Sequence, residues 1–164
     1  MRFVLRERLF GFGDDFYIKD ESGRDVFFVD GKVFSIGDKL SFRDMAGNEL
    51  AFIRQKVIAL RPTYEIYRNG ELAATVNKAL LSLFRDRFKI DVPGPDDLEA
   101  HGNFWDYEYE IVRNGRLVAR ASKRWFSFRD TYGVDIVDDE DAILILATVV
   151  VIDLVSHDQD KDRQ

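Results

Sequence analysis

The sequence contains no cysteine, which excludes disulfide bonds, thiolate metal ligands and cysteine nucleophiles together. Proline is scarce, with 3 copies in 164 residues, so few positions would interrupt a sheet. The first residues, from Met1 to Arg8, lack an apolar run because charges break them up, and we expect no signal peptide and a cytoplasmic location. Basic residues are fewer than acidic ones, with 24 Lys and Arg against 30 Asp and Glu. The net charge of −6 leaves no general basic footprint, so we expect no nucleic-acid partner.

What is present is a globular composition, with 46% hydrophobic and 33% charged residues. Phenylalanine alone has 14 copies, and aromatic residues favour strands. The length suits one domain with a substantial core. We therefore predict a single soluble domain over residues 1–156 and a disordered polar tail over residues 157–164.

Short aromatic and apolar runs recur along the first part of the chain, separated by turn residues. This rhythm predicts strands in a sandwich or barrel. The expected strands lie at residues 14–19, 25–29, 32–36, 39–43 and 49–55. The Pro93-Gly94-Pro95 run predicts a loop.

An internal repeat follows. Residues 64–82 match residues 109–127 at ten of nineteen positions, with an offset of 45 residues. Each copy contains Asn-Gly, Asn69-Gly70 or Asn114-Gly115, which is a strong hairpin signal because both central residues of a type I′ turn need positive φ. Each copy thus predicts a hairpin followed by a further strand, over residues 77–84 in the first copy and 123–128 in the second.

The most apolar stretch lies at residues 142–155. It is too short for a bilayer span, which needs about 20 residues. Acidic residues at 138–141 precede it, where a helix dipole favours negative charge. A strand is the alternative, because β-branched residues dominate. A helix that is apolar all round has to be buried on all sides, so we predict a central helix wrapped by the sheet.

Together these features resemble the LURP-one-related family of the tubby C-terminal-like superfamily. The residues that carry the resemblance are 61–66, the two Asn-Gly hairpins, Phe126-Ser127-Phe128 and the segment 138–155. The resemblance implies a mainly β fold, a closed antiparallel β-barrel of about twelve strands around the buried hydrophobic C-terminal helix. Relatives include phospholipid scramblases and tubby proteins, which have been linked to membranes, phosphoinositides and transcription. The resemblance by itself assigns no binding residue and no function to this chain.

No arrangement of residues predicts catalysis. His101, beside Gly102, is interpreted as a loop histidine without an activated nucleophile, and His157 falls in the predicted tail. The loop acids Asp96 and Asp97, with Glu99, are interpreted as solvated rather than as an acid–base pair. Gly11-Phe12-Gly13 lacks the third glycine and the helix of a dinucleotide site, and is interpreted as a turn. The acids at 135 and 138–141 lack the spacing of a Ca²⁺ loop, so we expect no metal site and no cofactor.

The second repeat differs from the first mainly in added positive charge. In a two-residue hairpin Arg113 faces Arg116 and Ile111 faces Val118, while Arg120 faces Tyr109 and could form a cation–π pair with it. A solvated face explains these residues. The alternative is that Arg113, Arg116 and Arg120 bind an anionic group such as a lipid phosphate. We therefore expect a non-enzymatic binding or scaffold domain whose partner is an anionic lipid headgroup or a protein. The alternatives are an enzyme or small-molecule-binding protein whose site has no sequence motif, marked by a polar pocket holding His101 and a carboxylate, and a structural, oligomer-forming protein.

Overall fold

A computed structural model describes residues 1–7, 15–31, 39–57, 60–79, 87–125 and 130–157. These residues form twelve strands and one helix. The strands are β1 (Arg2–Arg6), β2 (Phe16–Asp20), β3 (Asp25–Asp30), β4 (Lys39–Asp44), β5 (Glu49–Gln55), β6 (Thr63–Arg68), β7 (Glu71–Lys78), β8 (Arg87–Asp91), β9 (Leu98–Asn103), β10 (Glu108–Arg113), β11 (Arg116–Ser122) and β12 (Thr131–Ile136), and the helix is α1 (Ala142–His157).

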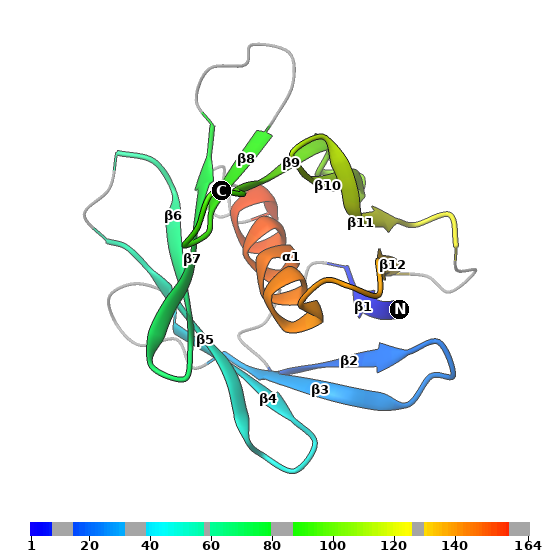
Figure 1. Cartoon of the computed structure of the whole chain (residues 1–164). Coiled ribbons are helices and arrows are strands. Elements are labelled where there is room, and N and C mark those ends of the chain that lie inside the picture. Colours follow the sequence, from blue (N-terminus) through cyan, green and yellow to red (C-terminus); the bar gives the residue numbers. More distant parts are fainter. Residues whose placement is uncertain (8–14, 32–38, 58–59, 80–86, 126–129, 158–164) are drawn as a thin grey trace, which may run out of the picture.

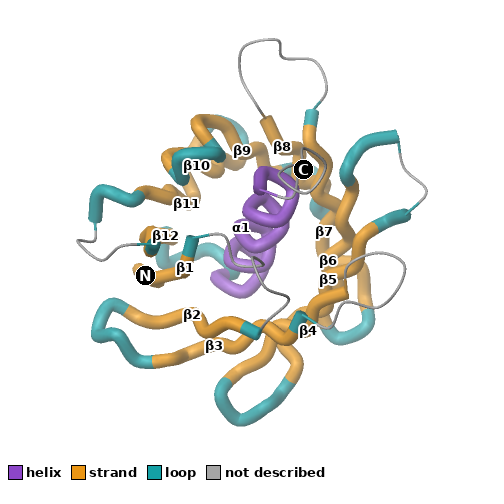
Figure 2. Tube along the Cα trace, turned by 180° about the vertical axis from the view of Figure 1, so that it is seen from behind, coloured by secondary structure: helices purple, strands orange, loops and turns teal. Residues whose placement is uncertain are grey.

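The strands form a closed antiparallel barrel in which each strand pairs with its neighbours in sequence. The circle closes where β1 pairs with β12, with Phe3 opposite Val134. The strands encircle α1 when the molecule is seen from either side (Figures 1 and 2). The fold class predicted from the sequence and from the family resemblance is confirmed.

Alternation along the strands separates an inner from an outer face. In β10, Tyr109 and Ile111 are buried, whereas Glu108 and Glu110 on the other face are partly exposed. Successive side chains of a strand point to opposite faces, so every second residue of the barrel wall faces the helix.

The helix fills the interior of this barrel. Its residues from Leu144 to Val155 are all buried, and they are apolar except for Thr148 and Asp153. The Thr148 hydroxyl donates to the Leu144 carbonyl at 2.9 Å, so this polar group is satisfied within the helix. At the start, a carboxylate oxygen of Asp141 accepts hydrogen bonds from the backbone N–H groups of Ile143 (3.1 Å) and Leu144 (3.2 Å), which makes Asp141 the N-cap.

The predicted strands at 14–19, 25–29, 39–43 and 49–55 correspond to β2, β3, β4 and β5, and the Pro-Gly-Pro loop joins β8 to β9. The strand expected at 123–128 is wrong where it can be compared, because β11 ends at Ser122 and residues 123–125 turn. The remainder of that strand, the strand expected at 32–36, most of the one expected at 77–84, and Gly11-Phe12-Gly13 lie outside the described residues. The helix includes His157, which we had placed in the tail.

The two repeated hairpins, β6–β7 and β10–β11, share one geometry. Positive φ occurs at both turn residues of each, with 51° and 78° at Asn69 and Gly70 and 49° and 75° at Asn114 and Gly115. Each hairpin then carries a register shift at the equivalent place, so that Ile66 faces Ala74 and Ile111 faces Ala119. This bulge makes two of the predicted pairings wrong: Ile111 does not face Val118, and Arg120 faces Glu110 rather than Tyr109.

Candidate functional site

The acidic run before α1 ties the helix to four parts of the barrel wall. Asp138 contacts the amino group of Met1 at 3.2 Å, and Asp141 contacts Arg68 of β6 at 2.6 Å. Between them, Asp139 and Glu140 contact arginines of the β10–β11 hairpin. We had assigned all four acids to the helix N-terminus. Only Asp141 caps the helix; the other three precede it and form ion pairs. We call residues 138–141 the acidic clasp.

Arg113 and Arg116 lie directly opposite each other, as predicted. Arg113 donates two hydrogen bonds to the Glu140 carboxylate, at 3.2 and 3.0 Å, and a third to the Asp96 carbonyl at 2.7 Å. The Glu140 side chain is only 8% exposed. Arg116, more exposed, lies 3.4 Å from Asp139 and 3.6 Å from Glu140. The acidic clasp therefore compensates the two like charges that the hairpin places together.

Arg120 belongs to a row of polar side chains that crosses the outer face of the barrel. Its guanidinium contacts Glu110 of β10, and His101 of β9 lies 3.8 Å from the same carboxylate. On the other side Arg120 faces Asp135 of β12, which contacts Arg2 of β1 at 3.4 Å. Alternating charges directly opposite one another stabilise adjacent strands. Hence Arg120 is not grouped with Arg113 and Arg116, and His101 lies in strand β9 rather than in a loop.

The acids near the Pro-Gly-Pro loop have structural partners. Asp96 accepts a hydrogen bond from the Asn114 amide at 2.7 Å, and Asp97 accepts one from the Val92 N–H at 3.0 Å. Glu99, on β9, contacts Arg87 at 2.8 Å. No group of three or more histidine or carboxylate side chains in the described ranges is arranged to hold a metal ion.

The end of α1 carries two polar side chains that are nearly buried, Asp153 and His157. His157 lies 3.7 Å from Asp153. The imidazole stacks on Tyr107, with ring centroids 4.8 Å apart, and also contacts Trp105 at 4.9 Å. Nearby, the Tyr132 hydroxyl is buried and has no hydrogen-bond partner among the residues that the structure describes. Burial raises the pKa of Tyr132 well above its ordinary value, and the charge of Asp153 adds to that effect. Sequence reasoning missed this cluster because it treated His157 as tail.

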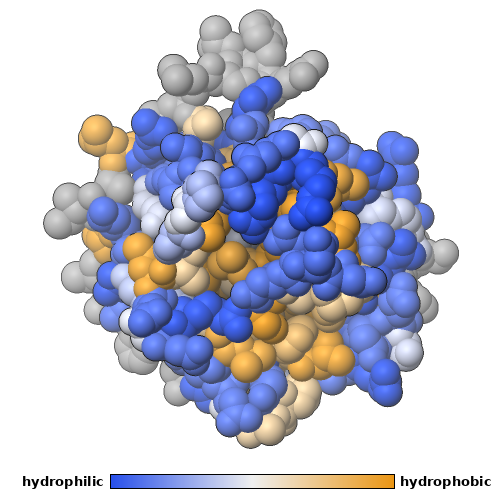
Figure 3. Space-filling view, viewed as in Figure 1, coloured by the Kyte–Doolittle hydropathy of each residue, from blue (hydrophilic) through white to orange (hydrophobic). Residues whose placement is uncertain are grey.

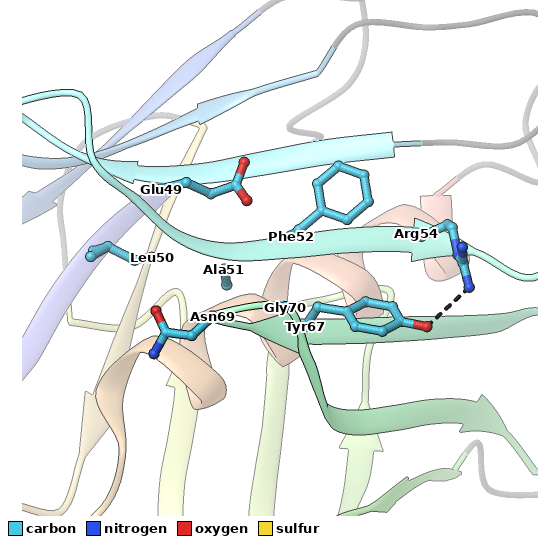
Figure 4. A pocket seen from close by; sticks show the side chains of 8 residues that line it. All are labelled: Glu49, Leu50, Ala51, Phe52, Arg54, Tyr67, Asn69 and Gly70. Carbon is cyan, nitrogen blue, oxygen red and sulfur yellow. Dashed lines mark hydrogen bonds between the residues drawn. The ribbon is translucent and has the colours of Figure 1, made fainter.

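A groove of about 310 Å³ lies on the outer face between β5 and β6, beside the Asn69-Gly70 turn (Figure 4). Its walls include the rings of Phe52 and Tyr67 and the guanidinium of Arg54. Arg54 donates to the Tyr67 hydroxyl at 2.9 Å, and that hydroxyl donates to Glu65 at 3.1 Å. The Tyr67 hydroxyl is thus occupied, while its ring lines the groove.

The charged side chains around this groove are paired with neighbouring polar groups. The hydrogen bond from Arg54, 2.9 Å long, lowers the pKa of Glu65 and keeps it ionised. Burial raises the pKa of Tyr67, and its hydrogen bond to Glu65 adds to that effect. At the other end, Glu49 accepts a hydrogen bond from Ser41 at 2.7 Å, and Arg43 donates to the same hydroxyl at 2.9 Å. The groove therefore presents aromatic surface and satisfied polar groups.

A second groove, of about 380 Å³, occupies the equivalent place beside the Asn114-Gly115 turn. Val112, Asn114 and Gly115 line it, and they correspond to Tyr67, Asn69 and Gly70 after the offset of 45 residues. Here β8, β9 and the loop that joins them contribute charged residues, Arg87, Lys89, Asp97 and Glu99. The 45-residue repeat is the sequence signal that both grooves share. His101 lines neither groove.

One face of the molecule shows apolar side chains at its middle, over the place where α1 lies in Figure 1, with hydrophilic residues around them (Figure 3). Val137, Ala142 and Ile143, at the entrance to the helix, are half-buried against the core. No helix within the described ranges combines the length and the apolarity that crossing a membrane would require.

Comparison with known proteins agrees with this architecture. A Bacillus subtilis (strain 168) protein, "Uncharacterized protein YxjI", is 30% identical over 158 residues, covering 96% of this chain and 95% of that protein. The X-ray structure of an Arabidopsis thaliana protein superposes with a TM-score of 0.66 over 97% of this chain and 91% of that chain; at 15% identity this shows a shared fold. The family model for LURP-one-related proteins matches residues 1–153, and the chain belongs to that family.

Proposed function

We propose that this chain is a non-enzymatic binding or scaffold domain whose partner binds to the outer surface of the barrel. The observation that carries the proposal is the filled interior. Twelve consecutive residues of α1 are buried inside the ring of strands, where a ligand of other barrels would lie. The described grooves lie outside, beside the two repeated hairpins.

The two histidine–carboxylate pairs support a non-enzymatic domain. His101 and Glu110 lie on the outer face, with side chains 42% and 35% exposed, and neither lines either of the two described grooves. His157 and Asp153 are nearly buried, which leaves them without access to one. An enzyme remains the alternative, and a catalytic activity lost in a His101→Gln variant would favour it.

Of the two partner classes, the structure favours a protein over an anionic lipid headgroup. A phosphate would have to compete with Glu140 for Arg113 and with Glu110 for Arg120. Those carboxylates are already in place, whereas each basic residue near an anionic membrane gains only about 1 kcal/mol. Arg113 and Arg120 therefore form ion pairs within the barrel, which a ligand would have to break.

Two measurements test this proposal. In thermal unfolding with sodium oleate, an amphiphile whose apolar chain probes the interior, we expect an unchanged midpoint. A rise together with chemical-shift changes at the buried amides of α1 would show a ligand held inside the barrel. In co-sedimentation at low salt, we expect equal pelleting with vesicles of phosphatidylserine–phosphatidylcholine and of phosphatidylcholine alone. Selective pelleting with the anionic vesicles that disappears in an Arg113→Ala, Arg116→Ala, Arg120→Ala variant would establish lipid binding instead.

A further inference from the structure

The outer surface over β5, β6 and β7 differs from that over β8, β9 and β10. Over β8, β9 and β10 the outward side chains are polar or charged except for Val112. Over β5, β6 and β7 an unbroken apolar row crosses three strands. Phe52 lies directly opposite Tyr67, and Tyr67 lies directly opposite Leu72. Opposed residues share a face of the sheet, so these three side chains form one strip, which we call the apolar row.

The apolar row is accessible in part. Leu72 is 42% exposed, and Phe52 and Tyr67 are half-buried. Two of its members, Phe52 and Tyr67, also line the groove of about 310 Å³, which is at the low end of the roughly 300–1,000 Å³ of ligand pockets. That volume suits one large side chain rather than an extended ligand.

The charged side chains beside the apolar row are already paired, which disfavours a charged occupant. Arg54 is held by Glu65 at 2.9 Å, and Glu49 and Arg43 share the Ser41 hydroxyl. A bound charge would have to break one of these contacts to find a partner. The Arg54 guanidinium already lies 5.3 Å from the centroid of the Tyr67 ring. An uncharged apolar side chain that packs beside it, on Phe52, Tyr67 and Leu72, breaks none of these hydrogen bonds.

The second repeat provides an internal comparison. Its hairpin has the same turn, the same bulge and an equivalent pair, Val112 opposite Leu117, and Leu117 is 39% exposed. On the preceding strand, however, Val112 faces Glu99, which is paired with Arg87. The apolar pair there is not continued into a three-strand strip, and Phe52 is the residue that makes the difference.

We propose that the apolar row and its groove are the docking surface for an uncharged aromatic or branched aliphatic side chain presented by a partner protein. This inference rests on the proposed function and specifies its surface and the chemistry of its partner. Aromatic residues dominate the energetics of such interfaces because they bury large areas, and they favour offset or edge-on contact with other rings.

The test uses the full chain and four small probes. The ¹⁵N-labelled protein is titrated with N-acetyl-tryptophanamide, N-acetyl-leucinamide, N-acetyl-lysinamide and N-acetyl-aspartamide, and amide chemical shifts are followed. We expect saturable shifts at Phe52, Tyr67 and Leu72 with the first two probes and none there with the charged two. Shifts confined to other parts of the chain, no shifts, or equal binding of a charged probe would overturn the assignment.

Matched variants separate the surface from the fold. Leu72→Lys is expected to raise the Kd for N-acetyl-tryptophanamide at least about tenfold, whereas Leu117→Lys, its equivalent in the second hairpin, leaves the Kd unchanged. Tyr67→Phe retains the ring and should retain binding. Both lysine variants are checked by thermal unfolding, which we expect to be unaltered. Equal Kd values for the Leu72→Lys and Leu117→Lys proteins would contradict the inference. That result would leave the proposed function standing, whereas oleate bound against α1 inside the barrel would overturn the proposed function itself.

Discussion

Replacing Glu140 by alanine removes the centre of the acidic clasp. In the wild type, Glu140 is almost buried and accepts two hydrogen bonds from Arg113, with Arg116 3.6 Å away. The variant leaves the opposed Arg113 and Arg116 with one fewer carboxylate between them. Arg113 keeps the Asp96 carbonyl, and Arg116 keeps Asp139. The variant therefore weakens the compensation without removing every partner.

The expected loss in the free energy of unfolding of the Glu140→Ala protein lies between two limits. Breaking a fully buried ion pair costs about 3–5 kcal/mol, and an exposed pair contributes about 0–1 kcal/mol. Because the Arg113 side chain is 23% exposed, we expect about 2 kcal/mol. For a domain of this size, that loss lowers the unfolding midpoint by roughly 4–8 °C.

Thermal and urea unfolding, followed by circular dichroism, measure this loss, and Glu110→Ala is the matched control. Glu110 is paired with Arg120, but the two side chains are 35% and 51% exposed, so we expect a loss below about 1 kcal/mol. Because Arg113 loses its carboxylate partner, the Glu140→Ala protein should also gain stability from inorganic phosphate, which the wild type should not. Equal losses in the Glu140→Ala and Glu110→Ala proteins would refute this account of the clasp.

Three further predictions concern stability. Gly102→Ala should lower the unfolding midpoint by several degrees because Gly102 has φ of 138° and an added Cβ would lie 2.6 Å from the Glu108 carbonyl oxygen. Gly23→Ala is the control: its φ of 80° also strains an alanine, but a Cβ there meets no described atom within 4 Å, so calorimetry should show a smaller loss, and equal losses would contradict the reasoning. Truncation before Ala142 should abolish cooperative unfolding, whereas deletion of residues 158–164 should not change the midpoint; a cooperative melt of the truncated monomer would contradict this. The folded-state pKa of Glu65 is lowered, so its contribution is present above pH 4.5 and disappears as pH falls through the lowered value; the destabilisation by Glu65→Gln should shrink in melts at acid pH, and a constant difference would count against the pair.

Local patterns predicted much of this fold. The strands β2 to β5 follow from short apolar runs between turns, and the Asn-Gly signals correctly placed both repeated hairpins. α1 followed from its length and its apolarity on all sides. Closure into twelve strands came from the family resemblance, because the pairing of β1 with β12 joins residues about 130 positions apart and no local pattern encodes it.

The arrangement of the candidate sites was harder to predict. A bulge of one residue shifts the pairing partner of Arg120 from Tyr109 to Glu110, and the repeat sequence does not show the bulge. By sequence, each of the four acids at 138–141 suits a helix N-terminus as well as the others do. Only the position of the β10–β11 hairpin in the fold shows that Glu140 pairs with Arg113. Likewise, the apolar row depends on the register of three strands, so Phe52, Tyr67 and Leu72 become neighbours only in the folded barrel.

We expect α1 to fill the barrel permanently, so that a partner is recognised outside it. Native-state hydrogen exchange of the amides in the middle of α1, from Leu146 to Ile152, tests this most directly. Exchange there should require global unfolding, and its free energy should equal that from urea unfolding of the whole protein. A free energy lower by more than about 2 kcal/mol would show that the helix leaves the folded barrel, and would contradict the account by opening the interior to a ligand.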